Sequence, residues 1–208
     1  MSLLMTAGDR LLPENDPRLI ASEARSVLQQ VRAWLGRLFP GASLNALPVE
    51  TSSFFRLQFQ SHPNDRFRRP ASVGFGLAQV FPLIVLGLAA TEANTLLIEN
   101  PEVHLHPAAQ SRVGEFIGAC VASGVQMVVE THSDHVINGI RKAVATRQGL
   151  AEKVVFYSIF GNQQSPGEAE LEEILIDENG TLSKWPRGFF DQAATDARAL
   201  VLGEYDEQ

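Results

Sequence analysis

The sequence predicts an α/β protein with a mainly parallel sheet and flanking helices, and three observations predict this fold class. Two short apolar runs, TLLIE (95–99) and VQMVVE (125–130), have the length and composition of buried parallel strands. Each run is followed by a helical pattern, which begins near Pro107 in the first case and at Asp134 in the second. Hydrophobic residues make up 45% of the chain and charged residues 20%, so a packed core is expected.

Length, charge and cysteine content limit the protein class further. The 208 residues suffice for one sizeable core, and we expect a single domain over 1–208. A net charge of −7 argues against a surface that coats nucleic acid. Cys120 is the single cysteine and lies in an apolar helical pattern, so we expect a small buried side chain and no disulfide framework. The chain shows neither a secretory signal nor a membrane-length apolar run, which predicts a cytoplasmic protein without membrane contact.

The segment before residue 71 is expected to form a helix and strand arm (1–70). Asp16 and Pro17 are typical of a helix start and Pro40 of a helix stop, so we predict one amphipathic helix between them. Two strands and a polar loop are expected to follow, over residues 43–50, 54–60 and 61–70.

The predicted core covers residues 71–150, and a C-terminal extension covers 151–208. In the core, a glycine-bearing turn opens an apolar helix that ends near Ala90, ahead of the two parallel strands. The extension is expected to contain two strands, a turn and a final helix, over residues 153–160, 169–177, 178–180 and 188–205, with a flexible link over 161–168.

Polar residues follow both predicted parallel strands at the point where each strand ends. The first strand runs into Glu-Asn-Pro-Glu (99–102) and the second into Glu-Thr-His-Ser-Asp (130–134). Ligands of α/β sheets collect at the carboxyl ends of the strands, so these clusters face one crevice if the strands are neighbours. A carboxylate that ends a buried strand is costly to desolvate and needs a cation or a donor beside it. The pattern therefore favours a functional site over a structural one.

The turn at 71–79 (ASVGFGLAQ) is the third candidate. Gly74 and Gly76 let the backbone approach a ligand closely, and the helix that follows directs free N–H groups and a positive dipole end toward it. Ser72 adds a hydroxyl donor. Taken alone, this turn is equally consistent with a helix start that binds no ligand.

In order and spacing, these stretches resemble the second half of an ABC-type ATPase head, as in SMC-like and OLD-type (overcoming-lysogenization-defect) ATPases. The turn at 71–79 resembles the signature motif, and LLIENPEVHLHP (96–107) resembles a Walker B strand with its D-loop. VVETHSDHVI (128–137) resembles the strand that carries the switch histidine. The ending IDENGTLSKWPRGFFDQ (176–192) is similar to a C-terminal domain of unknown function in one bacterial subfamily.

The resemblance implies a P-loop NTPase fold that binds ATP with Mg²⁺ between two heads. It implies that Ser72, Gly74 and Gly76 form the turn that contacts the γ-phosphate of ATP held by a partner. It implies that Glu99 holds Mg²⁺ through water, and that His132 donates to the γ-phosphate and senses its presence.

The stretch after Glu99 departs from the family pattern. The catalytic glutamate of the family directly follows the Walker B acid, and here that position is Asn100, which can orient a water but cannot take its proton. Glu102 or Glu99 acting as the base and slow hydrolysis are the open alternatives. Leu105 and His106 correspond to the D-loop, which implies contacts across a dimer.

A Walker A motif, G-x-x-x-x-G-K-[ST], is absent from this sequence. Its three lysines are Lys142, Lys153 and Lys184, and none of them follows a glycine. We therefore expect either the C-terminal part of a longer ATPase or a short protein that has lost or borrows its nucleotide-binding half. The chain alone is expected to be inactive and to need a Walker A-bearing segment or a head-to-head homodimer.

The function implied by the resemblance is an ATP-driven conformational switch linked to DNA handling or phage defence, with a nuclease or DNA as its partner. Two alternatives stay open at this point: a degenerate interaction module that does not hydrolyse ATP, and a metal-dependent hydrolase that uses His104 and His106. The basic loop with Arg66, Arg68 and Arg69 is consistent with a nucleic-acid contact, a phosphate contact or a solvated loop.

Overall fold

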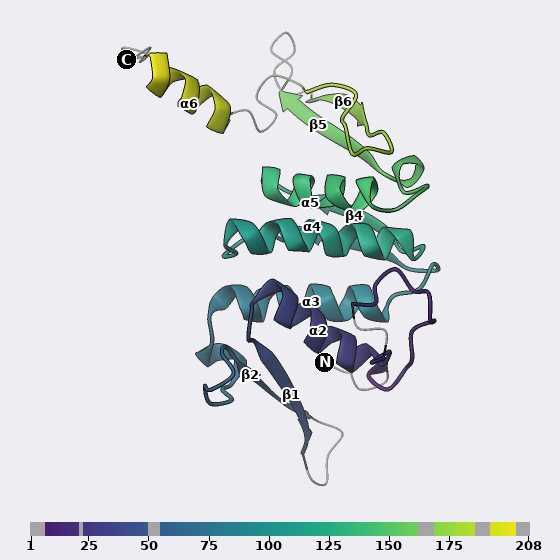
Figure 1. Cartoon of the computed structure of the whole chain (residues 1–208), viewed down its shortest axis with the longest axis vertical. Helices are drawn as coiled ribbons and strands as arrows, with labels where there is room; N and C mark the ends of the chain where they lie inside the picture. Colours follow the sequence, from purple (N-terminus) through teal and green to yellow (C-terminus); the bar gives the residue numbers. More distant parts are fainter. Residues whose placement is uncertain (1–6, 21–22, 50–54, 162–168, 186–191, 203–208) are drawn as a thin grey trace. The chain divides into compact units, whose positions relative to one another are not determined.

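The computed structural model describes residues 7–20, 23–49, 55–161, 169–185 and 192–202. It divides the chain into two compact units, Met1–Ala143 and Val144–Gln208, which we describe separately (Figure 1). The expectation of a single domain stays a prediction, because two such units can belong to one domain.

The first unit begins with a helix and a hairpin. Helix α2 (Val27–Leu38) is followed by strands β1 (Ser43–Pro48) and β2 (Phe55–Gln60), which pair in antiparallel register as the sequence predicts. Ser26 caps α2: its hydroxyl accepts a hydrogen bond from the backbone N–H of Gln29, whose side chain accepts one from the N–H of Ser26. Two of the N–H groups that every helix start leaves unpaired are thereby satisfied.

The predicted helix start at Asp16 is wrong, because α2 begins about ten residues later. Asp16 and Arg18 form a buried ion pair instead, with 2.6 Å between Oδ2 and Nη2 and side-chain exposures of 3% and 6%. A tertiary contact thus uses the residue that local pattern assigns to a cap. Ser26 and Gln29, a capping-box pair in the sequence, were the correct signal.

The rest of the first unit alternates helices and strands as predicted. Strands β3 and β4 pair in parallel and in register, and helix α4 makes the crossover between them. Helices α3 and α4 lie side by side in Figure 1, and they contact β3 and β4 respectively. The elements are η1 (Pro70–Ser72), α3 (Phe75–Ala89), β3 (Thr95–Glu99), α4 (Pro107–Ala122), β4 (Gln126–Glu130) and α5 (Asp134–Ala145).

One face of the β3–β4 pair is open in the part of the chain that the structure describes. Exposure alternates along both strands, and the cross-strand partners Leu97 and Val128 are 77% and 55% exposed. The sequence predicts buried parallel strands with flanking helices, whereas the described helices cover one face of the strand pair. Parallel pairing is likewise limited to β3 and β4 among the described strands, because the other strand pairs are hairpins.

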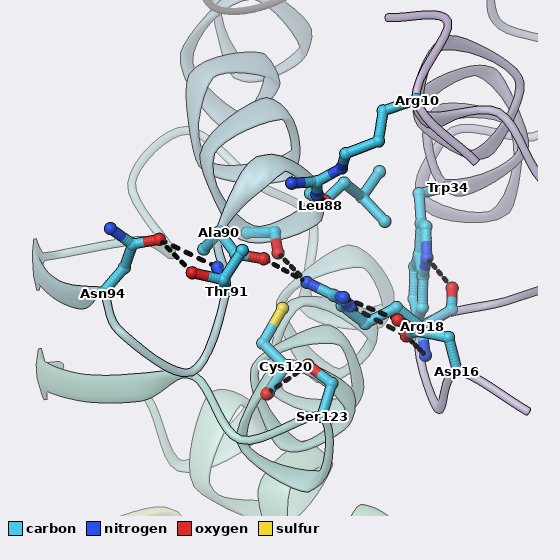
Figure 2. A network of polar contacts seen from close by, with 11 residues as sticks. Arg10, Asp16, Arg18, Trp34, Leu88, Ala90, Thr91, Asn94, Cys120 and Ser123 are labelled. Carbon is cyan, nitrogen blue, oxygen red and sulfur yellow. Dashed lines mark hydrogen bonds and ion pairs between the residues drawn. The ribbon is translucent and has the colours of Figure 1, made fainter. Parts of the chain in front are cut away.

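Two arginines hold the C-terminal end of α3 (Figure 2). Arg18 donates hydrogen bonds to the carbonyls of Gly87 at 3.0 Å and Ala90 at 2.8 Å, and Arg10 donates to the carbonyl of Leu88 at 2.9 Å. The indole of Trp34 in α2 donates to the carbonyl of Arg18. Since the last carbonyls of a helix lack partners and carry negative charge, these cations join the N-terminal segment to α3.

The ion pair also determines the ionisation of Asp16. Burial alone would raise the pKa of Asp16, but the side-chain and backbone hydrogen bonds from Arg18 outweigh burial, so the pKa lies below its ordinary value. Asp16 is therefore ionised in the folded protein at neutral pH.

The second unit contains a hairpin, a turn and a helix. Strands β5 (Val155–Gly161) and β6 (Ala169–Leu175) follow η2 (Ala151–Lys153) and pair antiparallel, as predicted. The predicted turn at 178–180 is confirmed, since Asp177 accepts hydrogen bonds from the N–H groups of residues 179 and 181. Helix α6 (Gln192–Leu202) confirms the middle of the last predicted helix. The ends of that helix, most of the WPRGFFD stretch and the link at 162–168 lie outside the described residues.

None of the described helices is long and apolar enough to cross a membrane.

We expect Asp16→Asn to destabilise the protein by about 3 kcal/mol at pH 7, because it leaves Arg18 buried without its countercharge. The matched control is Glu14→Gln, which breaks the exposed pair of Glu14 with Arg25 and should cost under about 1 kcal/mol. Urea denaturation measures both.

Because the folded-state pKa of Asp16 is lowered, its stabilisation is complete above the unfolded-state pKa and is lost as pH falls through the folded-state pKa. The gap between wild type and Asp16→Asn should therefore stay constant from neutral pH down to about pH 5 and shrink below about pH 4. Equal costs for the two variants at pH 7 would contradict the role given to this pair.

Candidate functional site

The two predicted polar clusters meet at the carboxyl ends of β3 and β4. Glu99 and Glu130 are register partners at the last rung, and the backbone N–H of Asn100 donates to the carbonyl of Glu130 at 3.0 Å. The ring of His132 lies 3.6 Å from the Glu130 carboxylate, measured from Nε2 to Oε1. The side chains of His132 and Glu130 are 78% and 60% exposed, and Glu99 is also exposed. The prediction that the two strands are neighbours is confirmed, and it leaves two carboxylates and an imidazole open to a ligand.

Glu102 links the turn after β3 to the segment after β4. Its side chain is buried, and its two carboxylate oxygens accept hydrogen bonds from the Thr131 hydroxyl at 2.7 Å and from the backbone N–H of His132 at 2.8 Å. Each carboxylate oxygen of Glu102 thus has one hydrogen-bond donor. The geometry therefore suits Glu102 to positioning His132 more than to taking a proton from water.

Two residues of the turn after β3 have left-handed backbone conformations. Asn100 has φ 46° and His104 has φ 61°. Asparagine and histidine tolerate this conformation better than most residues with a side chain, because their polar groups bond locally. The backbone conformation thus gives a structural reason for an asparagine at position 100. A glutamate at this position would meet the same backbone conformation at a higher cost.

The signature-like turn contains two accessible positions and one packing position. Ser72 and Gly74 are exposed at the start of α3, and a Cβ on Gly74 would meet nothing within 4 Å. Gly76 is buried, and a Cβ there would lie 2.5 Å from the carbonyl oxygen of His104 and 2.9 Å from Cδ2 of Leu105. Gly76 therefore lets α3 pack against the turn after β3. Only Ser72 and Gly74 are placed to meet a ligand from solvent.

The predicted D-loop residues lie in that same turn. Leu105 is buried, and its N–H donates to the carbonyl of Glu102 at 3.0 Å. His106 is the N-cap of α4, and its Nδ1 accepts from the N–H of Ala108 at 3.3 Å. The ring of His104 packs edge-on against Phe75, with 4.6 Å between ring centres.

The metal-hydrolase interpretation gains no support from this geometry. His104 contacts an aromatic ring and His106 caps a helix, so the two imidazoles do not converge on a shared position. Within the ranges that the structure describes, no group of three or more His, Cys, Asp or Glu side chains is arranged to hold a metal ion. Glu99 and Glu130 are both exposed, as a water-mediated contact with Mg²⁺ requires.

A groove runs along the outer edge of β3 and ends at the site. Its walls come from α3 on one side and from β3 with the following turn on the other. The lining residues are Gln79, Val80, Leu83, Leu86, Leu96, Leu97, Ile98, Glu99, Asn100 and Pro101. This edge of β3 has no strand partner among the described residues, so its backbone groups are available for pairing.

The sequence places Thr131 and Ser133 in the polar cluster after β4 without indicating a role for either, and it gives no sign of Gln110. Thr131 holds the Glu102 carboxylate, and Ser133 donates to the Gln110 amide oxygen at 2.6 Å. Gln110 lies one turn into α4, where a polar residue in a helix pattern gives no local signal. Its partner Ser133 lies 23 residues away in sequence, and only the tertiary fold brings the two together.

Two family models match the chain. Residues 3–138 match the family described as "AAA domain, putative AbiEii toxin, Type IV TA system". Residues 158–200 match a family described as "Protein of unknown function (DUF3696)". No curated protein matches the chain significantly.

Solved structures of SMC heads share the fold. One is an SMC ATPase studied for ATP-driven dimerization and DNA-stimulated activation, with 14% identity and a TM-score of 0.54 over 85% of this chain and 92% of that chain. A second is an SMC head bound to the C-terminal winged-helix domain of ScpA, with 14% identity and a TM-score of 0.55 over 75% and 44%. A third is the Pyrococcus furiosus head with an extended coiled coil, bound to the C-terminal domain of ScpA, with 11% identity and a TM-score of 0.53 over 86% and 38%.

These similarities establish the fold class. The chain has the α/β, P-loop NTPase fold of SMC ATPase heads, as its sequence predicts. It spans less than half the length of the second and third of these proteins.

We expect Gly76→Ala to destabilise the protein by about 1–3 kcal/mol, because its methyl group would overlap the carbonyl of His104. Gly74→Ala is the matched control in the same turn and should cost under about 1 kcal/mol, since it meets open space at a helix N-cap. Chemical denaturation at one pH compares the two. A larger cost at Gly74 than at Gly76 would show that α3 does not pack on the turn as described.

Proposed function

We propose that this chain, which belongs to the family described as "AAA domain, putative AbiEii toxin, Type IV TA system", acts as the signature and Walker B portion of an ABC-type ATPase head. In this role it binds Mg-ATP together with a Walker A-bearing segment and changes conformation as ATP is bound and hydrolysed. The observation that carries the proposal is that Glu99, Glu130 and His132 lie together and exposed at the carboxyl ends of β3 and β4.

Three residues at these strand ends, Glu99, Asn100 and His132, have chemistry suited to a nucleoside triphosphate. Glu99 offers an exposed carboxylate to Mg²⁺, directly or through water, and the metal neutralises phosphate charge when bound. His132 offers a ring N–H to the γ-phosphate, and its backbone N–H donates a hydrogen bond to the Glu102 carboxylate. Asn100 is placed to orient the attacking water. Because Glu102 is buried and both of its oxygens already accept hydrogen bonds, proton removal falls to Glu99, or hydrolysis is slow.

The open face and edge of β3 fit the missing half of the site. Leu97 and Val128 present apolar surface, and the groove beside β3 ends at Asn100. Burial of such surface favours association, and an unpaired strand edge favours pairing with another strand. We propose that a Walker A-bearing segment covers this face and brings its lysine and backbone amides to the phosphates.

The signature-like turn fits a second contact, with another head. Ser72 and Gly74 are exposed at the N-terminal end of α3, where free N–H groups and the helix dipole favour an anion. In a head-to-head homodimer this turn would meet the γ-phosphate of ATP bound to the partner. Leu105 and His106 lie in the turn that packs on α3, so a D-loop contact would follow from the same arrangement.

The family description and one structural neighbour support an output for the switch. The family description names a type IV toxin–antitoxin system, and one SMC neighbour is described as activated by DNA. These support a role in DNA handling or phage defence with a nuclease or DNA as partner. The exposed Arg66 and Arg69 could contact nucleic acid, whereas Arg68 pairs with Asp65 at 3.1 Å.

We expect His132→Ala to lower ATP turnover ten- to a hundredfold when the chain is combined with a Walker A-bearing segment. A charge-assisted hydrogen bond to the γ-phosphate contributes roughly 1.5–3 kcal/mol if it is made in the transition state. The melting temperature should stay unchanged, because the His132 side chain is 78% exposed. Phosphate release and thermal denaturation are the measurements.

The matched control is His135→Ala, which removes a nearby imidazole that pairs only with Asp134, at 3.7 Å. Equal turnover for the two variants, or a lower melting temperature with full turnover for His132→Ala, would remove His132 from the switch position.

A further inference from the structure

Gln110 connects the turn after β3 with the segment after β4. Its amide nitrogen donates to the carbonyl of Leu105 at 2.9 Å, and a longer contact of 3.4 Å reaches the carbonyl of Glu102. Its amide oxygen accepts from the hydroxyl of Ser133 at 2.6 Å. One side chain on α4 thus holds both polar stretches of the site.

We infer that Gln110 is a positioning residue that makes the D-loop turn (100–106) and the switch segment (131–133) move as one body. Two separate links support this inference. The Glu102 carboxylate holds Thr131 and the N–H of His132, and the Gln110 amide holds Leu105 and Ser133. Two links at different points resist rotation as well as separation, which a single link does not.

The hydrogen-bond directions show why an amide is needed here. The Ser133 hydroxyl accepts from the N–H groups of His135 and Val136, where it caps the start of α5, and so its one proton goes to Gln110. Gln110 must therefore accept at its oxygen and donate at its nitrogen. A glutamate would lack the donor, and a methionine of similar shape would lack both.

The consequence for regulation rests on the proposed function. If His132 senses the γ-phosphate, any displacement of its segment is passed to Leu105 and His106 through Gln110 and Glu102. The turn that holds those residues also packs against Gly76 of α3. Nucleotide state at one head would thus alter the surface that faces a second head.

Hydrogen exchange measured by NMR on the full chain, without nucleotide, tests the positioning directly. In Gln110→Met, the amides of Leu105 and His132 should exchange about three- to tenfold faster. The turn that contains Leu105 and the segment that contains His132 each lose a hydrogen bond to Gln110. The amide of Phe116, buried on the same helix, should keep its wild-type rate. The matched control is Ser111→Ala, which removes the neighbouring hydrogen bond between Ser111 and Lys142 and should leave Leu105 and His132 unchanged.

Faster exchange at all three amides would mean that Gln110 stabilises the whole unit. An unchanged rate at Leu105 and His132 would mean that Gln110 does not hold the two segments together. Either result overturns the inference. Ser133 supplies a second test: Ser133→Ala should reproduce the pattern at Leu105, and Ser133→Thr, which keeps the hydroxyl, should not.

Turnover separates this inference from the proposed function. With a Walker A-bearing segment, Gln110→Met should lower kcat about three- to tenfold and change KM for ATP less than about twofold, since the phosphate-cradling half is untouched. A wild-type chain without any turnover would count against the proposed function, while the exchange rates would still decide the role of Gln110.

Discussion

Parallel pairing of β3 with β4 is the constraint on which the site depends. Because α4 makes a crossover between two parallel strands, β3 and β4 end at the same side of the pair. Their register places Glu99 opposite Glu130. An antiparallel pair, or a shift of one residue, would separate the carboxylates or turn one of them into the helices. Glu102 then fixes the position of His132 across that pair. The chemistry of the edge follows from this register.

Helix α3 is held at both ends by contacts with other parts of the first unit. Its C-terminal end is held by Arg18 and Arg10 from the N-terminal segment, as Figure 2 shows. Its N-terminal end rests on the turn after β3, where Gly76 allows a close approach. A firmly held helix keeps Ser72 and Gly74 at a defined distance from the strand ends. The turn at 71–79 and the turn after β3 are thereby parts of one packed body.

The elements that depend on local pattern were predictable, and the contacts that depend on distant residues were not. The strand ends and the start of α5 follow from apolar runs and polar stops. The helix start at Asp16 failed because a buried arginine two residues away uses that carboxylate. Gly76 looked like a ligand position, since nothing in the sequence shows the carbonyl of His104 above it. Cys120 was predicted to be a buried hydrophobe, and burial raises the pKa of its thiol to about 12.

An NMR titration of the labelled chain with Mg-ATP, with and without a Walker A-bearing segment, tests most directly whether these strand ends bind a nucleotide. We expect the amides of Asn100 and His132 to shift together only when the segment is present, and to give the same dissociation constant, in the micromolar range. The chain alone lacks the lysine and amide cradle and should give no saturable shift at micromolar ATP. Micromolar binding by the chain alone, or saturable shifts confined to β5 and β6, would contradict the claim that these strand ends form a shared nucleotide site.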